Sequence, residues 1–156
     1  GLIKAFSLVK DKLDHVLVIA GSKDKKVDEI DNLKRDLNIE DRIIELVSPD
    51  DDLVINLYQN ADLFVFPSFF EGFGLPPLEA LACNCPVISS NIPVLKEILG
   101  NEIACFNPYD INDIADKILY GIKNKETLLK IGKERLKIFD KDKIINEYIE
   151  LFKNII

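Results

Sequence analysis

Residues 67–80 read PSFFEGFGLPPLEA, and this stretch decides how the rest of the chain is interpreted. The apolar run ADLFVF at residues 61–66 comes directly before it and predicts a buried strand, whereas Leu78–Ala82 predicts the start of a helix. A strand, a glycine-bearing loop and a helix start form a site in which backbone N–H groups can face an anion. Two carboxylates, Glu71 and Glu79, bracket the loop with seven residues between them. The stretch is therefore the first candidate for a functional site.

The loop offers donors suited to a diphosphate. Gly72 and Gly74 permit a positive φ and a close approach of a ligand to the backbone. Because two prolines follow in the first turn of the helix, the free N–H donors there are those of Phe73, Gly74 and Leu75. These donors lie at the positive end of the helix dipole, where a diphosphate is favoured.

The two carboxylates are suited to sugar hydroxyls. Glu79 lies about one turn into the predicted helix, where it can accept hydrogen bonds from two vicinal hydroxyls such as those of a ribose. Glu71, in the loop that begins at Ser68, can do the same for a sugar ring. A purely structural interpretation stays open, because the helix dipole alone favours a nearby Glu by about 0.3–1 kcal/mol. Gly72 and Gly74 can likewise simply shape a turn.

The composition predicts one acidic globular domain. The 156 residues, 47% of them hydrophobic, suffice for a core, and a net charge of −7 without a basic stripe argues against a nucleic-acid partner. No apolar run approaches the roughly 20 residues that a membrane span needs, and the N-terminus does not resemble a signal peptide. The odd number of cysteines, all in apolar settings, predicts buried, reduced thiols at Cys83, Cys85 and Cys105 and a cytoplasmic location.

Short apolar runs alternate with amphipathic segments along the chain. The apolar runs predict parallel strands over 16–20, 43–47, 63–66, 86–89 and 103–106. The amphipathic segments predict helices over 2–9, 27–37, 53–58, 76–82, 94–99, 111–123, 128–139 and 144–155. This alternation predicts an α/β fold with a doubly wound parallel sheet.

The helices predicted at the two ends of the sequence indicate how the domain is organised. A helix packed on a parallel sheet normally follows a strand, and no strand precedes the first predicted helix. We therefore expect residues 1–139 to form a Rossmann-like domain whose first strand is missing. The apolar terminal helix within 140–156 is expected to pack toward an absent N-terminal domain.

Other motifs favour structural roles. The turn AGSK at residues 20–23 lacks the G-x-G-x-x-G pattern of nicotinamide and flavin sites. The acidic run at residues 50–52 predicts an N-cap and first helical turn rather than a metal site. His15 has no Ser or Cys partner in any recognisable pattern, so we expect it at the surface or at a strand edge.

The segments ADLFVFPS at 61–68, EGFGLPPLEA at 71–80 and CPVISS at 85–90 resemble the C-terminal, donor-binding domain of retaining glycosyltransferases with the GT-B fold. The resemblance is to glycosyltransferase family 4, also called glycosyl transferases group 1, and Glu71 and Glu79 match its E-x7-E motif. It runs from about residue 2 to about residue 139. The fold it implies is the C-terminal half of a GT-B enzyme.

The resemblance also implies roles for individual residues. Glu79 would hold the ribose hydroxyls of a nucleotide sugar. Glu71 would be the catalytic residue, contacting hydroxyls of the transferred sugar and supporting positive charge at its anomeric carbon. The donor-binding set implied is Ser68, Gly72, Phe73, Gly74, Leu75 and Glu79.

The implied reaction moves a hexose, with retention, from UDP-, GDP- or ADP-hexose to a hydroxyl acceptor in surface polysaccharide or glycoconjugate synthesis. Neither a metal nor another cofactor is implied. The acceptor, a sugar or a lipid-linked glycan, would be held by the absent N-terminal domain, with the parent protein at the inner face of the membrane. An Arg and a Lys that neutralise the leaving diphosphate in the family lie ahead of the first helix, so we expect the isolated chain to be inactive. Asn84 stands where the family usually has Gly, and Asn tolerates the left-handed conformation of such a turn.

Alternative functions stay open at this point. A nucleotide-sugar-binding scaffold domain would keep the donor pocket without turnover. A GT-B-type sugar epimerase or phosphorylase would share the fold but would need its own acid and base residues. A phospho-receiver domain is disfavoured, because Asp62 precedes its predicted strand rather than following it.

Overall fold

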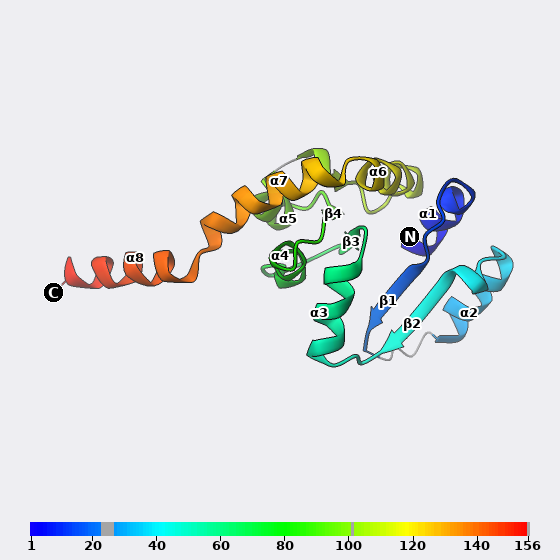
Figure 1. The fold of residues 1–156 in the computed structure, drawn as a ribbon, viewed down its shortest axis with the longest axis horizontal. Coiled ribbons are helices and arrows are strands. Elements are labelled where there is room, and N and C mark those ends of the chain that lie inside the picture. The colour runs from blue at the N-terminus through cyan, green and yellow to red at the C-terminus, as the bar shows by residue number, and fades with distance from the viewer. Residues whose placement is uncertain (23–26, 101, 156) are drawn as a thin grey trace.

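The computed structural model describes residues 1–22, 27–100 and 102–155, in which strands and helices alternate (Figure 1). The strands are β1 (Leu17–Gly21), β2 (Ile43–Val47), β3 (Phe64–Phe66), β4 (Val87–Ser90) and β5 (Cys105–Phe106). The helices are α1 (Leu2–Val9), α2 (Val27–Asp36), α3 (Asp51–Asn60), α4 (Leu75–Ala82), α5 (Pro93–Leu99), α6 (Ile111–Lys123), α7 (Lys125–Leu136) and α8 (Lys141–Lys153). Short 3-10 turns are η1 (Lys10–Lys12), η2 (Glu40–Arg42), η3 (Glu102–Ala104) and η4 (Lys137–Phe139). Position 23 of the predicted AGSK turn and the last residue of the terminal segment lie outside the described residues.

The predicted elements are present, with differences at their ends. The strand expected over residues 103–106 is wrong in its first half, because Glu102–Ala104 form a 3-10 turn and only Cys105–Phe106 pair with β4. Helix α3 begins earlier than predicted because the Asp50 carboxylate accepts a hydrogen bond of 2.8 Å from the Leu53 N–H. The acidic run at 50–52 therefore caps a helix, and across the described residues no cluster of His, Cys, Asp and Glu could hold a metal.

All strand pairs are parallel, as predicted, but the described strands form two sheets rather than one. Strand β1 pairs with β2, and β3, β4 and β5 form a separate sheet in the order β3-β4-β5. Because the strands of each sheet run in one direction, the loops that follow them emerge at a common carboxyl edge.

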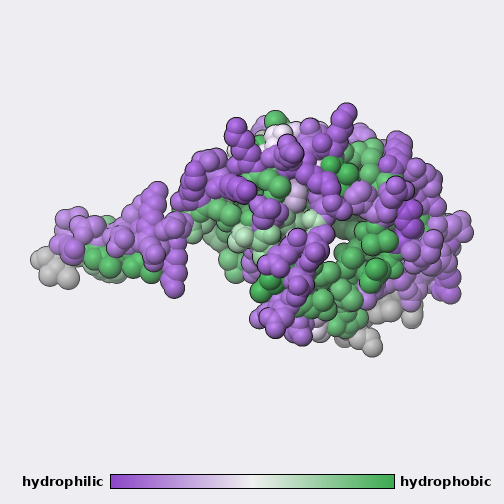
Figure 2. All heavy atoms as spheres, viewed as in Figure 1, coloured by the Kyte–Doolittle hydropathy of each residue, from purple (hydrophilic) through white to green (hydrophobic). Residues whose placement is uncertain are grey.

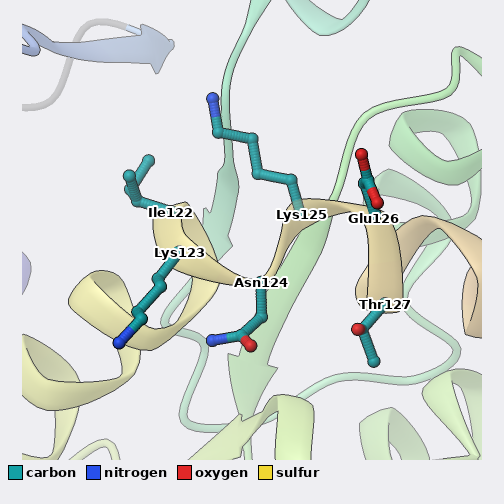
Figure 3. Close-up of a pocket in the computed structure, with 6 residues that line it drawn as sticks. All are labelled: Ile122, Lys123, Asn124, Lys125, Glu126 and Thr127. Carbon is teal, nitrogen blue, oxygen red and sulfur yellow. The ribbon is translucent and has the colours of Figure 1, made fainter.

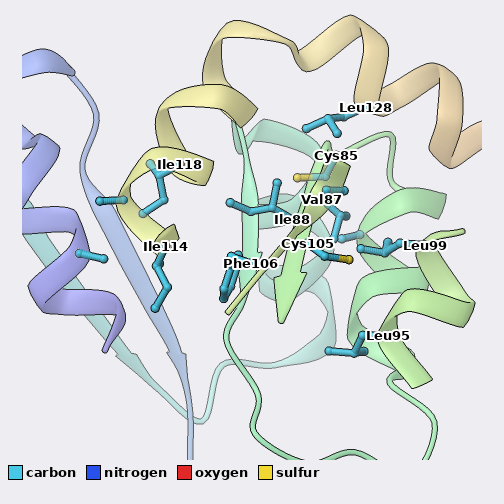
Figure 4. Packing of buried hydrophobic residues seen from close by; sticks show 14 of the residues in the cluster. Cys85, Val87, Ile88, Leu95, Leu99, Cys105, Phe106, Ile114, Ile118 and Leu128 are labelled. Atoms are coloured by element: carbon cyan, nitrogen blue, oxygen red, sulfur yellow. The ribbon is translucent and has the colours of Figure 1, made fainter. Parts of the chain in front are cut away.

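The main core surrounds β4, whose four residues are all buried. Val87 and Cys105 point to the face covered by Leu95 and Leu99 of α5, whereas Ile88 and Phe106 point to the face covered by α6 (Figure 4). Successive residues of a strand face opposite sides of a sheet, and both faces of β4 are covered, so all of its side chains are buried. This half of the molecule is doubly wound, as the alternation of elements predicts.

Strands β1 and β3 differ from the prediction that they are buried. Both lie wholly within the described residues, and none of their residues is buried. The apolar runs LVIAG and FVF are only partly covered because each strand has a neighbour on one side only. Their composition suits the interior of a sheet, and their position here is at an edge.

Helix α8 extends away from the rest of the chain (Figure 1). Every residue of it is exposed, and hydrophobic atoms gather along one side of the helix (Figure 2). The prediction that it packs on another domain stays a prediction. None of the described helices combines the length and apolarity that crossing a bilayer requires.

The three cysteines, all within the described residues, form no disulfide, and their burial predicts their reactivity. Burial raises the pKa of the Cys85 thiol from 9.0 to about 12 and also raises the pKa of Cys105. Only the half-buried Cys83 should react with Ellman's reagent at pH 8 in the native chain, and all three should react in denaturant. A Cys83→Ser variant should lose the native reaction, and rapid native labelling that persists in this variant would contradict the burial described here.

The buried Cys85 thiol makes the free energy of unfolding depend on pH. The folded pKa of Cys85 lies above that of an unfolded thiol, so its contribution is fully present below about pH 9 and is lost as the pH rises toward 12.

Candidate functional site

The predicted loop leaves the carboxyl end of β3 and enters α4. Phe66 ends β3 opposite Ser89 of β4, and Leu75 begins α4, so residues 67–74 lie at the carboxyl edge of the sheet. Gly74 is the N-cap residue of α4 and adopts φ 90° and ψ 55°, in the left-handed region. A Cβ at this position would lie 2.7 Å from Cδ2 of Leu95, so both backbone conformation and close packing on α5 require glycine.

Gly72 does not behave as the sequence predicts. It is exposed, does not adopt a left-handed conformation, and a Cβ there would meet nothing within 4 Å. Glycine at this position is therefore not needed for the fold, which leaves space for a ligand beside the backbone.

Ser68 holds the Glu71 carboxylate. The Ser68 Oγ lies 2.8 Å from Glu71 Oε1 and 2.9 Å from the carbonyl oxygen of Phe70, so its single hydrogen can be donated to either acceptor. Both Ser68 and Glu71 are partly buried. The pair links the end of β3 to the middle of the loop and restricts the orientation of the carboxylate.

The start of α4 presents backbone donors. No side chain caps this helix, because its N-cap residue is Gly74 and prolines occupy its first turn. Leu75 and Phe73 are both about half exposed. The ring of Phe73 meets the ring of Phe139 in η4 edge to face, with 6.1 Å between the ring centroids. Phe73 is thus anchored on one side and open on the other. The N–H groups of residues 73–75 lie at the positive end of α4, as predicted.

Glu79 lies one turn further along α4 and is exposed. Burial and, next, the negative charge of Glu79 raise the pKa of Tyr58 in α3 to about 12. The Glu79 carboxylate therefore lies close enough to α3 for its charge to influence Tyr58. Of the two motif carboxylates, Glu79 is thus exposed and Glu71 is partly buried.

The turn that follows α4 confirms a prediction about Asn84. This residue adopts φ 62°, which lies in the left-handed region. Asn is one of the few residues that tolerate this conformation. The helix can therefore end and the chain can enter β4 with Cys85 and Val87 buried.

Two features of this edge were missed in the sequence. Tyr109, in the loop after β5, places its ring 5.0 Å from that of Phe69, and thereby joins the loops that follow β5 and β3. Its turn is held by Asn107, whose Oδ1 accepts from the Tyr109 N–H at 3.0 Å. The hydroxyl of the fully buried Ser90, at the end of β4, has no hydrogen-bond partner among the described residues. The signal that the sequence offered for this turn is the stretch NPYD at residues 107–110.

A separate hollow lies where α6 meets α7 and is lined by Ile122, Lys123, Asn124, Lys125, Glu126 and Thr127 (Figure 3). The Lys125 ammonium pairs with Asp62 and lowers the pKa of that carboxyl group. Asp62 precedes β3 and so marks the amino edge of the sheet. His15, which we expected at the surface or a strand edge, is also there, with Nε2 3.3 Å from Asp62 Oδ2. This hollow is therefore not part of the loop site.

Comparison with known proteins places this geometry in a family. The family model for glycosyl transferases group 1 matches residues 1–137. O-antigen chain mannosyltransferase B of Escherichia coli is 32% identical over 159 residues, covering 98% of this chain and 42% of the relative. The serotype-specific mannosyltransferase WbdA of Escherichia coli is 57% identical over 65 residues, which are 42% of this chain and 8% of that protein.

A solved structure agrees with these relatives. Sucrose-phosphate synthase from Thermosynechococcus elongatus superposes with a TM-score of 0.78 at 26% identity, covering 99% of this chain and 42% of that chain. This chain thus spans less than half the length of each of these proteins. Since the family match extends over residues 1–137 and the fold agrees, the chain belongs to the glycosyl transferases group 1 and has an α/β fold of the GT-B type.

Proposed function

We propose that this chain is the donor-binding part of a retaining glycosyltransferase that moves a hexose from a nucleoside diphosphate sugar to a hydroxyl acceptor. The observation that carries the proposal is the loop at 67–74, in which Ser68 holds Glu71 beside the uncapped start of α4. The two Escherichia coli relatives are named mannosyltransferases, one of them for the O-antigen chain, which supports mannose as the sugar and surface polysaccharide as the product.

In this proposal the backbone of the loop binds the diphosphate. The N–H groups of Phe73, Gly74 and Leu75 point from the start of α4, whose dipole is equivalent to about half a positive charge. As the sugar leaves, negative charge develops on the diphosphate, and fixed donors stabilise that charge without reorganising. The two prolines in the first turn of α4 have no N–H, so the available backbone donors are those of residues 73–75.

The two glutamates divide the remaining contacts. Glu79 accepts hydrogen bonds from the ribose hydroxyls. Ser68 holds one oxygen of Glu71, and the other stays available to hydroxyls of the transferred hexose. A fixed carboxylate near the anomeric carbon stabilises the positive charge of an oxocarbenium-like transition state. Neither role requires a metal.

In this proposal the acceptor substrate is bound by another domain of the whole protein and not by this chain. The exposed apolar side of α8 would pack on an acceptor-binding domain of the whole protein. Without that domain we expect the isolated chain to bind nucleotide weakly and to transfer no sugar.

A thermal-shift titration of the chain with UDP, GDP and ADP tests the proposal. A ligand at a hundred times its dissociation constant stabilises a fold by about 2.7 kcal/mol, so one nucleotide should raise the melting temperature and thereby identify the base. Adenosine, which lacks the diphosphate, is the control and should have little effect. No shift with any of the nucleotides, from a folded sample, would contradict donor binding by this chain.

A further inference from the structure

The loop at 67–74 is supported by two other parts of the fold where it enters α4. The ring of Phe73 meets that of Phe139 in η4 edge to face, with 6.1 Å between the ring centroids. Gly74 packs on α5, since a Cβ there would lie 2.7 Å from Leu95 Cδ2 and 3.2 Å from Ile98 Cδ1. Phe73 and Gly74 carry two of the N–H groups at the start of α4. The positions of these donors therefore depend on η4 and on α5.

The C-terminal end of α5 is held by a side chain of α7, which packs against it (Figure 1). The Gly100 N–H donates to the carbonyl oxygen of Lys96 at 2.8 Å. The next two carbonyl oxygens accept from Arg135, whose Nε donates to Ile98 at 3.0 Å and whose Nη2 donates to Glu97. Gly100 adopts φ 61°, and a Cβ there would lie 2.5 Å from Cδ of Arg135, so glycine lets the arginine approach. Arg135 thus satisfies carbonyl groups for which α5 itself has no donor.

The same guanidinium also holds the ring that supports Phe73. Its Cζ lies 5.9 Å from the centroid of the Phe139 ring, a cation–π contact. Phe139 is partly covered by the main core, so its ring is packed from below as well. Contacts therefore lead from Phe73 through Phe139 to Arg135. From Arg135 they lead through Ile98 back to Gly74, so one arginine joins both supports of the loop.

The neighbouring residues show why these supports matter for binding. Gly72 is exposed, and a Cβ there would meet nothing within 4 Å, whereas Leu75 is 58% exposed. The bond between Ser68 and Glu71 restrains the first half of the loop. Glycine has more backbone freedom than any other residue, so an N–H of Gly74 without packing would have to be ordered by the ligand. Ordering weakens binding, whereas donors that are fixed beforehand bind without this cost.

We propose that Arg135 is a positioning residue for the diphosphate site at the start of α4. It acts through its neighbours, because its guanidinium is engaged by the carbonyl oxygens of α5 and by the ring of Phe139. Through α5 it fixes Gly74, and through Phe139 it fixes Phe73, so that both N–H groups are ordered before the nucleotide arrives. The role in binding rests on the proposed function, whereas the coupling of Arg135 to the loop does not.

Backbone order parameters, measured by ¹⁵N relaxation on this chain without nucleotide, test the coupling. In Arg135→Gln the values for Phe73 and Gly74 should both fall from about 0.85, typical of a rigid backbone, to about 0.6 or lower. In Phe139→Leu, which keeps the bonds to α5, the value for Phe73 should fall and that for Gly74 should stay. Leu128→Ala is the control, because Leu128 is 3% exposed and lies near the other end of α7. It should lower the midpoint of urea unfolding and leave both order parameters unchanged.

A titration with UDP, GDP and ADP in turn connects this coupling to binding. The nucleotide that binds the parent should bind Arg135→Gln at least about tenfold more weakly, because the ligand must then order the two donors. Its affinity for Leu128→Ala, measured at a temperature at which that variant is folded, should equal its affinity for the parent.

Three results would overturn the proposal. An unchanged order parameter of Phe73 in Arg135→Gln would mean that the arginine only caps α5. Equal loosening in Leu128→Ala would trace the effect to a general loss of stability, and unchanged nucleotide affinity in Arg135→Gln would separate the loop's order from binding. If Arg135→Gln does not fold, Phe139→Leu decides by the same two measurements at Phe73. Loosened donors in a chain whose parent binds no nucleotide would support the coupling and contradict the proposed function, so the two failures are distinguishable.

Discussion

A Glu79→Ala variant should lose most of the thermal stabilisation that the preferred nucleoside diphosphate gives to this chain. Hydrogen bonds to a charged group contribute about 1.5–3 kcal/mol, so their loss should weaken binding roughly ten- to a hundredfold. At a ligand concentration that stabilises the parent by about 2.7 kcal/mol, a hundredfold weaker complex retains only about 0.4 kcal/mol. Glu79 is exposed on α4, so the unliganded variant should melt near the temperature of the parent.

Glu71→Ala is the matched control for this experiment. In the proposed complex Glu71 contacts the transferred hexose, which a free nucleoside diphosphate does not contain. Glu71→Ala should therefore keep the nucleotide response, although the whole protein that carries it should lose sugar transfer. An unchanged response in Glu79→Ala would place the ribose away from α4, and equal losses in both variants would mean that the two glutamates do not have separate roles.

Replacing Phe106 with alanine should cause the largest loss of stability among substitutions near the carboxyl edge. The ring is 1% exposed and packs between β5 and α6 in the main core. Phe-to-Ala substitutions in cores cost about 3–5 kcal/mol, a large share of the 5–15 kcal/mol that typically separates native from unfolded chains. Urea unfolding should show a much lower midpoint with an unchanged slope.

Phe70→Ala provides the comparison for Phe106→Ala. Phe70 lies in the loop before Glu71 and is 85% exposed, so its removal should change the free energy of unfolding by about 0.5 kcal/mol or less. The two variants remove the same atoms and differ in burial alone. Similar midpoints for both would show that Phe106 does not contribute to the core in the way described here.

The sequence predicts local features of this protein well, because those features depend on neighbouring residues. Helix α6 begins after Asp110, whose carboxylate accepts from the N–H groups of Asn112 and Asp113. Asn84 takes the left-handed turn that its short polar side chain permits. The loop at 67–74 lies between a strand and a helix, as its glycines and prolines indicate. In each case the deciding interaction spans only a few residues.

The same local signals fail where the outcome depends on distant neighbours. The apolar runs of β1 and β3 predict burial correctly as a tendency, but the exposure of a strand depends on which strands lie beside it. Gly72 and Gly74 look alike in the sequence, and only Gly74 is held in the left-handed region by packing against Leu95. Strand 103–106 is shorter than its hydrophobicity suggests, because only Cys105–Phe106 can reach the ladder of β4.

By itself the sequence determined the order of strands and helices, the parallel α/β class and the position of the E-x7-E loop. Periodicity, turn residues and helix caps act within one element, and a single chain displays them in full. Only the tertiary structure decided that the described strands form two separate sheets, that Ser68 holds Glu71, and that Tyr109 meets Phe69. Those contacts join residues brought together by strand pairing and helix packing, and the contribution of each partner depends on the presence of the other.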